Sequence, residues 1–312
     1  NAVILFNLGG PDKLESVEPF LFNLFNDPAI ISIPSFFRYP LAKFISKRRA
    51  PIAKNIYKEI GNKSPILELT QDQANSLEKN LLKKGDYKCF VVMRCWHPRA
   101  EDVVKKVKEY NPDEVILLPL YPQYSASTSG SSIKEWNDLC IKENYKVKTK
   151  IICCYPTENN FLESHANLIK KTIKNLENKD FKLLFSAHGL PEIKIKRGDP
   201  YQWQVEQTVE GIMSKLTDEN PDYIISYQSR VGPLKWIGPS TDDIIIKYSK
   251  EKKGIVIVPV AFVSEHSETL VELDIEYKKL AEKNGCSFYK RVPALGIEEN
   301  FIKGLADLVL QK

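Results

Sequence analysis

The sequence predicts an α/β protein built from two similar Rossmann-like domains, each a four-stranded parallel sheet flanked by helices. Three observations favour this fold. Short apolar runs alternate with longer amphipathic stretches, which is the pattern of a parallel sheet covered by helices. The 312 residues exceed what one ordinary hydrophobic core accommodates. The two halves also repeat the same motifs at the ends of their expected strands.

The expected elements follow this alternation along the chain. Strands are predicted at residues 2–8, 87–93, 114–119 and 149–155 in the first half, and at 181–187, 223–227, 255–260 and 286–290 in the second. Helical periodicity predicts helices over Leu67–Lys84, Phe161–Leu176 and Ser264–Lys283. We therefore expect one domain over residues 1–155 and a second over 156–312, with the last helix packing back on the first domain.

The two halves share strand-end motifs but differ in length. A strand runs into a glycine turn at Gly9 and again at Gly189, and both halves later carry a strand with a penultimate proline. The polar segment after this proline strand begins at Gln123 in the first half and at Ser264 in the second. From the glycine turn to that point is 114 residues in the first half and 75 in the second, a difference of 39. The excess matches residues 29–67, which have no counterpart in the second half. We predict that they are an insertion, and insertions at strand ends often carry function.

Composition limits the classes of function. The chain is 43% hydrophobic and 27% charged, with a formal charge of +5. These values are typical of a globular protein. Lysine and arginine form no recurring stripe with interleaved aromatics, so the sequence does not favour nucleic-acid binding.

The cysteines and the apolar runs indicate a cytoplasmic protein. None of the six cysteines forms a CxxC pair, and Cys153-Cys154 sit in the apolar run Ile151–Tyr155, where neighbours in a strand point to opposite faces. We expect all six to be reduced and buried. No apolar run approaches the roughly 20 residues that span a bilayer. The sequence opens directly into a strand with no basic leader, so we expect a protein that at most rests on a membrane surface.

Common signatures of other α/β enzymes are missing from the expected ligand edge. Ligands of open parallel sheets bind beyond the carboxyl ends of the strands. There, Gly9-Gly10-Pro11 lacks the third glycine of a dinucleotide fingerprint, and no GxxxxGK[ST] motif occurs in the sequence. No GxSxG elbow supports a serine hydrolase either.

His188 is the first candidate for chemistry. It follows a buried strand, and Gly189 behind it allows another group to approach. A lone histidine can be a structural residue with its hydrogen bonds satisfied. Its position at the carboxyl end of a strand favours a functional role.

An acidic row forms the second candidate. Glu265, Glu268, Glu272 and Glu276 are spaced by three, four and four residues, which places them on one face of a helix beside His266. One interpretation is a solvated acidic face. The other is a path for a cation or for departing protons. With His188 across a cleft from Glu268, imidazole and carboxylate would hold a first-row divalent metal loosely.

The insertion supplies the third candidate. Residues 30–49 are rich in isoleucine and phenylalanine and end in the basic run Lys47-Arg48-Arg49. The segment could be a loop that folds back on the core. It could also be an apolar lip that grips a flat hydrophobic ligand and rests on an anionic membrane. Arginines suit carboxylates, and aromatic side chains suit a macrocycle; the candidates are Arg48, Arg49, Arg94, Tyr57, Tyr121, Tyr124 and Trp236.

Taken in order, the motifs resemble those of the ferrochelatase family over nearly the whole chain. They are Asn7-Leu8-Gly9-Gly10-Pro11, Lys47-Arg48-Arg49-Ala50-Pro51, Gly61-Asn62-Lys63-Ser64-Pro65, Tyr121-Pro122-Gln123-Tyr124-Ser125, Ser186-Ala187-His188-Gly189-Leu190-Pro191, Arg197-Gly198-Asp199-Pro200-Tyr201, Gln228-Ser229-Arg230-Val231-Gly232-Pro233 with Trp236, and His266-Ser267-Glu268-Thr269-Leu270. The fifth and last elements together are the most specific.

The resemblance implies a class II chelatase-like fold and a lyase that inserts Fe²⁺ into protoporphyrin IX in haem synthesis. It implies that His188 and Glu268 face each other across the porphyrin, bind iron and handle the pyrrole protons. It assigns the porphyrin contacts to Arg49, Tyr57, Ser64, Arg94, Tyr121 and Trp236. The proton or metal path would include Glu265, His266, Glu272 and Glu276. We expect a monomer, with possible peripheral contact at the inner face of the cytoplasmic membrane.

Two departures from other members refine this expectation. Some ferrochelatases hold an iron–sulfur cluster with one ligand at the position of Ala126. Alanine there, and the absence of a cysteine-bearing tail, predict that this chain has no cluster and no cofactor. Relatives that use coproporphyrin carry tyrosine at the position of Leu8, so leucine favours protoporphyrin IX. A chelatase for cobalt and a non-catalytic tetrapyrrole or metal carrier remain the alternatives.

Overall fold

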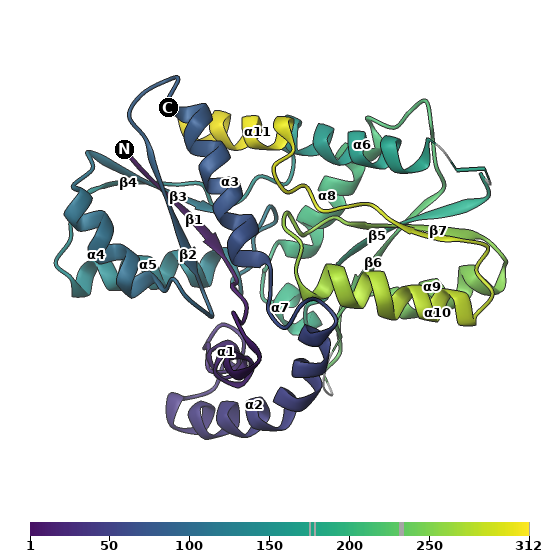
Figure 1. Cartoon of the computed structure of the whole chain (residues 1–312), viewed down its shortest axis with the longest axis horizontal. Helices are drawn as coiled ribbons and strands as arrows, with labels where there is room; N and C mark the ends of the chain where they lie inside the picture. Colours follow the sequence, from purple (N-terminus) through teal and green to yellow (C-terminus); the bar gives the residue numbers. More distant parts are fainter. Residues whose placement is uncertain (175, 178, 231–233, 312) are drawn as a thin grey trace. The chain divides into compact units, whose positions relative to one another are not determined.

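A computed structural model describes residues 1–174, 176–177, 179–230 and 234–311. They form two compact units, Asn1–Cys154 with Leu305–Lys312, and Tyr155–Gly304. Each unit contains one four-stranded parallel sheet (Figure 1). The expected motif residues Val231, Gly232 and Pro233 lie outside the described residues.

The first unit contains the strands that the apolar runs predict. They are β1 (Ala2–Asn7), β2 (Lys88–Met93), β3 (Glu114–Pro119) and β4 (Lys148–Ile151). Its helices are η1 (Leu14–Ser16), α1 (Val17–Phe25), α2 (Ser35–Lys58), α3 (Ile66–Leu81), α4 (Ala100–Tyr110) and α5 (Ser129–Lys142).

The second unit repeats this plan. Its strands are β5 (Phe181–His188), β6 (Tyr223–Gln228), β7 (Gly254–Pro259) and β8 (Tyr289–Arg291). Its helices are α6 (Asn159–Ile173), α7 (Glu192–Lys196), α8 (Tyr201–Met213), α9 (Thr241–Lys250), the π-helix η2 (Glu268–Glu276) and α10 (Tyr277–Lys283), while α11 (Glu299–Leu310) crosses the unit boundary.

Both sheets have the same strand order. The first is β2-β1-β3-β4 and the second is β6-β5-β7-β8, with every pair parallel. In this order the chain moves first to one side of its opening strand and then to the other. The reversal falls between β1 and β3 in one sheet and between β5 and β7 in the other. Open α/β sheets bind ligands at this switch point, at the carboxyl ends of the strands.

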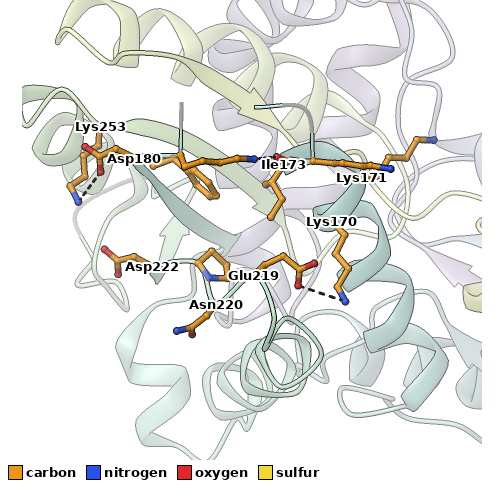
Figure 2. Close-up of a pocket in the computed structure, with 12 residues that line it drawn as sticks. Lys170, Lys171, Ile173, Asp180, Glu219, Asn220, Asp222 and Lys253 are labelled. Atoms are coloured by element: carbon orange, nitrogen blue, oxygen red, sulfur yellow. Dashed lines mark hydrogen bonds and ion pairs between the residues drawn. The ribbon is translucent and has the colours of Figure 1, made fainter. Parts of the chain in front are cut away.

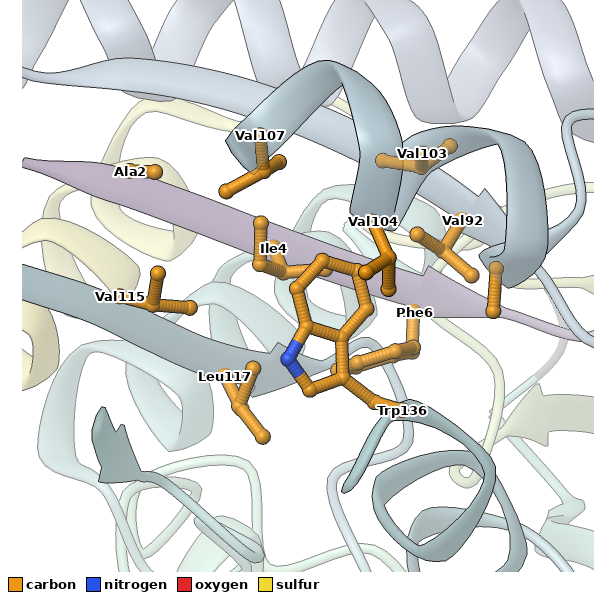
Figure 3. Close-up of a cluster of buried hydrophobic side chains, with 11 residues drawn as sticks. Ala2, Ile4, Phe6, Val92, Val103, Val104, Val107, Val115, Leu117 and Trp136 are labelled. Atoms are coloured by element: carbon orange, nitrogen blue, oxygen red, sulfur yellow. The ribbon is translucent and has the colours of Figure 1, made fainter. Parts of the chain in front are cut away.

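The first sheet is held by a dry apolar layer on one face. Alternate residues of β1 point toward α4 and α5, because side chains of a strand alternate between faces (Figure 3). Phe6 meets the fully buried Trp136 of α5 edge to face, with ring centroids 6.0 Å apart. Truncating either ring would cost about 3–5 kcal/mol, as large-to-small core substitutions do. This layer fixes the position of the β1 carboxyl end.

The insertion at residues 29–67 folds mainly as α2, a helix that packs on α1. Its small side chains Ala42, Ser46 and Ala50 are buried, whereas Phe36 is 69% exposed and Phe44 is 62% exposed. The segment therefore packs with one face and exposes aromatic side chains on another. The segment is thus a helix and not a loop, and its contact with a ligand or a membrane stays a prediction.

The segment expected as one helix over residues 264–283 begins only at Ser267, is π-helical over Glu268–Glu276 and continues as α10 from Tyr277. In η2 the backbone hydrogen bonds join residues five apart, as in the bond from Tyr277 N–H to the carbonyl of Glu272. Leu273 and Tyr277 pack against Leu184 and Ile257 of the sheet. Such π-helical turns are rare and frequently occur at functional sites.

The prediction that all six cysteines are buried was wrong at five of them, and the placement of Cys153 and Cys154 within a strand was also wrong. Strand β4 ends at Ile151, so Cys153 and Cys154 lie beyond it and do not point to opposite faces. Their Sγ atoms are 3.3 Å apart, and Cys153 is exposed. This edge strand pairs with β3 alone and has no buried residue. All six cysteines are free thiols, but of them only Cys95 is fully buried.

No helix among the described residues is both long enough and apolar enough to cross a membrane.

Candidate active site

The carboxyl edge of the second sheet brings His188 and Glu268 together. His188 is the last residue of β5, and Glu268 is the first residue of η2, which follows the neighbouring strand β7. The pair therefore lies at the switch point of this sheet. Glycine at position 189 is required here, since a Cβ would lie 2.9 Å from the Gln228 carbonyl oxygen and 3.2 Å from the Trp236 ring.

The two side chains touch each other directly. His188 Nδ1 lies 2.9 Å from Glu268 Oε2. The expectation that they face each other across a cleft, with the porphyrin between them, was wrong. The chain after β7 brings Glu268, at the start of η2, back to the end of β5, and this direct contact leaves no room for a ligand between the two side chains.

This contact determines which nitrogen of His188 is open for chemistry. With the proton on Nδ1 held by the Glu268 carboxylate, Nε2 carries a lone pair, and no described residue bonds to Nε2. Burial opposes a charge on the ring, but the Glu268 carboxylate outweighs it and raises the pKa of His188 above its ordinary value. Burial likewise opposes the charge of Glu268, yet His188 lowers the pKa of Glu268 to about 2. Glu268 is thus ionised and stabilises a protonated imidazole.

A second carboxylate, Glu272, is joined to this pair through Ser229. Ser229 follows β6 and donates from its backbone N–H to Glu272 Oε1 (3.0 Å) and from Oγ to Glu272 Oε2 (2.6 Å). The same Oγ lies 3.4 Å from Glu268 Oε2. Gln228 Nε2 donates a further bond of 3.0 Å to Glu272. Ser229 adopts φ +60°, the left-handed region that is uncommon for non-glycine residues and is often found at functional sites.

The two glutamates have opposite electrostatic environments. Burial, together with the nearby charge of Glu268, raises the pKa of Glu272 above its ordinary value. One carboxyl group is therefore held ionised while its neighbour accepts protons more readily. Carboxyl pairs whose pKa values are pushed apart are typical of sites that combine an acid with a base.

The rest of the expected acidic row does not belong to this cluster. Glu265 precedes η2 and forms an ion pair with Arg291 (2.9 Å) while accepting from Ala294 N–H (3.0 Å). The prediction that Glu265 shares a helical face with Glu268 and Glu272 was wrong. The helix begins after Glu265, and Arg291 at the end of β8 binds its carboxylate. Glu276 lies exposed at the far end of η2. His266 is buried, with Nδ1 3.1 Å from the Ser264 carbonyl oxygen.

Three residues of this network, Gln228, Ser229 and Tyr277, were not among the predicted site residues. Gln228 and Ser229 stand in one of the motifs quoted from the sequence, at the end of the predicted strand 223–227, and that motif was the signal for them. Tyr277 donates to Glu272 Oε1 at 3.1 Å although the two are five residues apart. That spacing falls on different faces of an α-helix, so helical periodicity could not pair them.

In the first unit, Arg94 binds carboxylates of the protein itself. Its guanidinium contacts Asp27 at 2.9 Å and Glu135 at 2.7 Å, and its Nε donates to Ser131 Oγ at 2.6 Å. Each nitrogen of the guanidinium contacts a protein group, and the contact of Arg94 with a ligand carboxylate stays a prediction. Arg94 ties Asp27, two residues before the insertion, to α5.

The remaining predicted porphyrin contacts fall into two groups. Tyr57 and Ser64 are buried within the first unit, Tyr57 in an apolar cluster with Val17 and Phe20. Ser64 N–H donates to the Pro11 carbonyl at 2.8 Å.

The others keep some surface. Arg49 is exposed on α2, with its guanidinium carbon 5.9 Å from the ring centroid of Phe25. Trp236 is half-buried, and its backbone pairs with that of Pro191 in an isolated antiparallel β-bridge. Tyr121 is half-buried, its hydroxyl group is buried, and burial raises its pKa.

A cavity of about 710 Å³ lies at the opposite edge of the second sheet. Figure 2 shows its lining, which includes Lys170, Asp180, Glu219 and Lys253. Two ion pairs lie in its lining, Lys170–Glu219 (3.7 Å) and Lys253–Asp180 (3.4 Å). Because β5 starts at this edge and ends at His188, the cavity is roughly 23 Å from the candidate site at 3.3 Å per residue. It is separate from the chemistry described above.

Within the described part of the chain, no three His, Cys, Asp or Glu side chains converge as a metal site. His188 and Glu268 offer one imidazole and one carboxylate, a donor set that suits a divalent first-row metal.

Comparisons with known proteins place this site in a family. The ferrochelatase family model matches residues 1–312. The chain is 67% identical over 314 residues to a ferrochelatase of Pelagibacter ubique strain HTCC1062, covering 100% of this chain and 91% of the relative. It is 50% identical over 312 residues to a ferrochelatase of Rickettsia bellii strain OSU 85-389, covering 99% and 86%. CbiX, the terminal enzyme for biosynthesis of sirohaem in denitrifying bacteria, has the same fold, with a TM-score of 0.54 at 11% identity and coverage of 99% and 97%. The chain belongs to the ferrochelatase family.

Proposed function

We propose that this protein inserts Fe²⁺ into protoporphyrin IX and releases two protons for each iron. The observation that carries the proposal is the contact of His188 Nδ1 with Glu268, which leaves Nε2 open at the switch point of a sheet. Membership of the ferrochelatase family names the reaction class. Relatives at 50–67% identity favour iron and protoporphyrin over cobalt or a carrier role.

The residues account for the proton transfers that insertion requires. A porphyrin keeps two N–H protons and hides its nitrogen lone pairs in the ring plane, so a base must remove the protons as the metal enters. Nε2 of His188 accepts one, and the Glu268 carboxylate stabilises the imidazolium that forms. Glu272, linked through Ser229, accepts a proton from the site in turn. Binding that distorts the ring exposes its lone pairs, and binding energy from the apolar parts of the ligand offsets this strain.

The second part of the proposal concerns membrane contact. The exposed face of α2 combines Phe36, Phe37 and Phe44 with the basic run at Lys47-Arg48. Apolar side chains bordered by lysine and arginine are the composition of segments that rest on anionic bilayers. We propose that α2 attaches the protein peripherally to such a membrane. We also propose that the enzyme works without an iron–sulfur cluster, since Ala126 replaces a cluster ligand.

One anaerobic assay tests the reaction. Purified protein is mixed with protoporphyrin IX and Fe²⁺ or Co²⁺, and the absorption bands of the porphyrin are followed against a protein-free control. Conversion to protohaem with iron supports the proposal. Preferred turnover of cobalt supports the rival chelatase, and a bound porphyrin that is never metallated identifies a carrier.

His188→Ala separates catalysis from binding in the same assay. It should lower turnover by about 10²–10⁴-fold, as loss of a general base does, while porphyrin still quenches tryptophan fluorescence. Retention of more than a tenth of the wild-type rate would remove His188 from its role as base.

A further inference from the structure

The hydroxyl group of Tyr277 lies between an inner and an outer carboxylate. It is 3.1 Å from Glu272 Oε1 and 3.2 Å from Asp242 Oδ2. The tyrosine is only 4% exposed, whereas Asp242 is an exposed residue of the first turn of α9. Helices α9 and α10 lie side by side, which brings Asp242 to Tyr277 (Figure 1). The hydroxyl group thus joins the buried end of the glutamate network to the protein surface.

Counting hydrogens shows what this arrangement can do. A tyrosine hydroxyl group has one hydrogen, and an ionised carboxylate only accepts hydrogen bonds. Tyr277 can therefore donate to only one of its two neighbours at a time. The second contact is a hydrogen bond only when that carboxyl group carries a proton and donates it to the phenol oxygen. With the proton on Glu272, the order of donation runs from Glu272 to Tyr277 and from Tyr277 to Asp242.

Resting on the proposed function, we propose that Tyr277 and Asp242 form the exit by which pyrrole protons leave the site. A proton that reaches Glu272 passes to the Tyr277 oxygen as the hydroxyl hydrogen of Tyr277 moves to Asp242 Oδ2. One O–H bond forms and one breaks at the tyrosine, and no electrons are exchanged. Asp242 then releases the proton to water, and the hydroxyl group turns back toward Asp242 for the next one.

The π-helix explains why the exit leaves η2 at this point. The bond from Tyr277 N–H to the Glu272 carbonyl spans five residues and brings the tyrosine beside the glutamate side chain. The rival exit would continue along the helix to Glu276. Among the contacts of the described residues there is none between Glu276 and Glu272.

Two substitutions with matched controls test the exit. Tyr277→Phe removes only the hydroxyl group, and Tyr289→Phe is its control, because Tyr289 packs in the same apolar cluster but donates to the backbone carbonyl of Leu273. Asp242→Asn removes the outer carboxylate, and Asp243→Asn removes its exposed neighbour in the same helical turn. Initial rates at saturating iron and porphyrin are measured in H₂O and D₂O, with melting temperatures alongside.

We expect Tyr277→Phe and Asp242→Asn to lower kcat at least about tenfold, less than the hundredfold typical of a group that touches the substrate. KM for porphyrin should not change, and the solvent isotope effect should rise as proton exit becomes limiting. A small exogenous buffer such as 2,6-dimethylpyridine should restore Asp242→Asn, whose position is open to solvent, but not Tyr277→Phe. Both controls should keep the wild-type rate and isotope effect.

The results separate this proposal from the reaction itself. If wild-type protein does not metallate porphyrin, the proposed function fails before the exit is tested. If wild-type protein is active and both Tyr277→Phe and Asp242→Asn match their controls in kcat and isotope effect, the exit through Tyr277 is refuted. A loss confined to Glu276→Gln would place the exit along η2 instead.

Discussion

His165 should make the second unit sensitive to mild acid. Its ring is fully buried in α6 against Phe161, with the ring centroids 4.9 Å apart. Neither ring nitrogen has a hydrogen-bond partner within the described protein. Burial disfavours the charged form and lowers the pKa of His165 from 6.5 to about 3. Between these two pKa values, His165 binds a proton in the unfolded chain but not in the folded chain.

The size of the effect follows from these two pKa values. The folded-state pKa is depressed, so the stability due to the neutral ring is intact above pH 6.5 and is lost progressively as pH falls from there toward 3. Between pH 7 and pH 5 the free energy of unfolding should fall by about 2 kcal/mol through this group alone. For a unit near 150 residues, this corresponds to about 4–8 °C in Tm.

The assay compares thermal unfolding of wild type and His165→Leu at pH 7 and at pH 5. Other acid-sensitive groups act on both proteins alike, so the difference between the two Tm shifts isolates His165 even if the variant is less stable at pH 7. His97→Leu, at an exposed histidine, is the matched control and should follow wild type. Equal Tm shifts for wild type and His165→Leu would show that the buried ring finds a partner for its proton, and the reasoning would be refuted.

Three further predictions concern the site and its surroundings. Glu268→Gln should reduce the maximal rate at saturating iron by about a hundredfold or more, because it removes the charge that stabilises protonated His188, whereas Glu272→Gln should reduce it less; equal effects within twofold in steady-state rates would contradict these roles. Phe36→Asp with Phe37→Asp should weaken binding to anionic liposomes and to porphyrin together, measured by co-sedimentation and fluorescence quenching. Purified protein should lack iron–sulfur absorption and labile sulfide, and a brown protein would overturn the interpretation of Ala126.

The strands could be predicted because their signal is local. Each is a short apolar run, and parallel strands buried on both faces are apolar throughout. The prediction was poorest at β4 and β8, the last strand of each sheet, where burial is incomplete. Strand β4 ends at Ile151, four residues before its predicted end, and its four residues are exposed or half-buried. Strand β8 begins at Tyr289, three residues later than predicted.

The site could be predicted only as a set of residues. Parallel strands carry their carboxyl ends to one edge, so His188 and Glu268 could be assigned to that edge from the sequence. Whether they oppose or touch each other depends on the pairing of β5 with β7. Asp242 and Tyr277 lie 35 residues apart, and their contact depends on how α9 packs beside α10. Helical periodicity could not reveal it.

Charge balance links the acidic segment to the reaction. Entry of Fe²⁺ adds two positive charges, and loss of two pyrrole protons removes two, so the net charge is restored only if both protons leave. His188 can hold one proton because Glu268 remains ionised beside it. A second proton on the same pair would have to neutralise Glu268, which its low pKa resists. Glu272 removes that conflict, since it accepts a proton more readily and contacts Tyr277. The pair of His188 and Glu268 can therefore return to its starting charge only as fast as Glu272 loses its proton. Loss of the exit should for this reason slow turnover without weakening porphyrin binding.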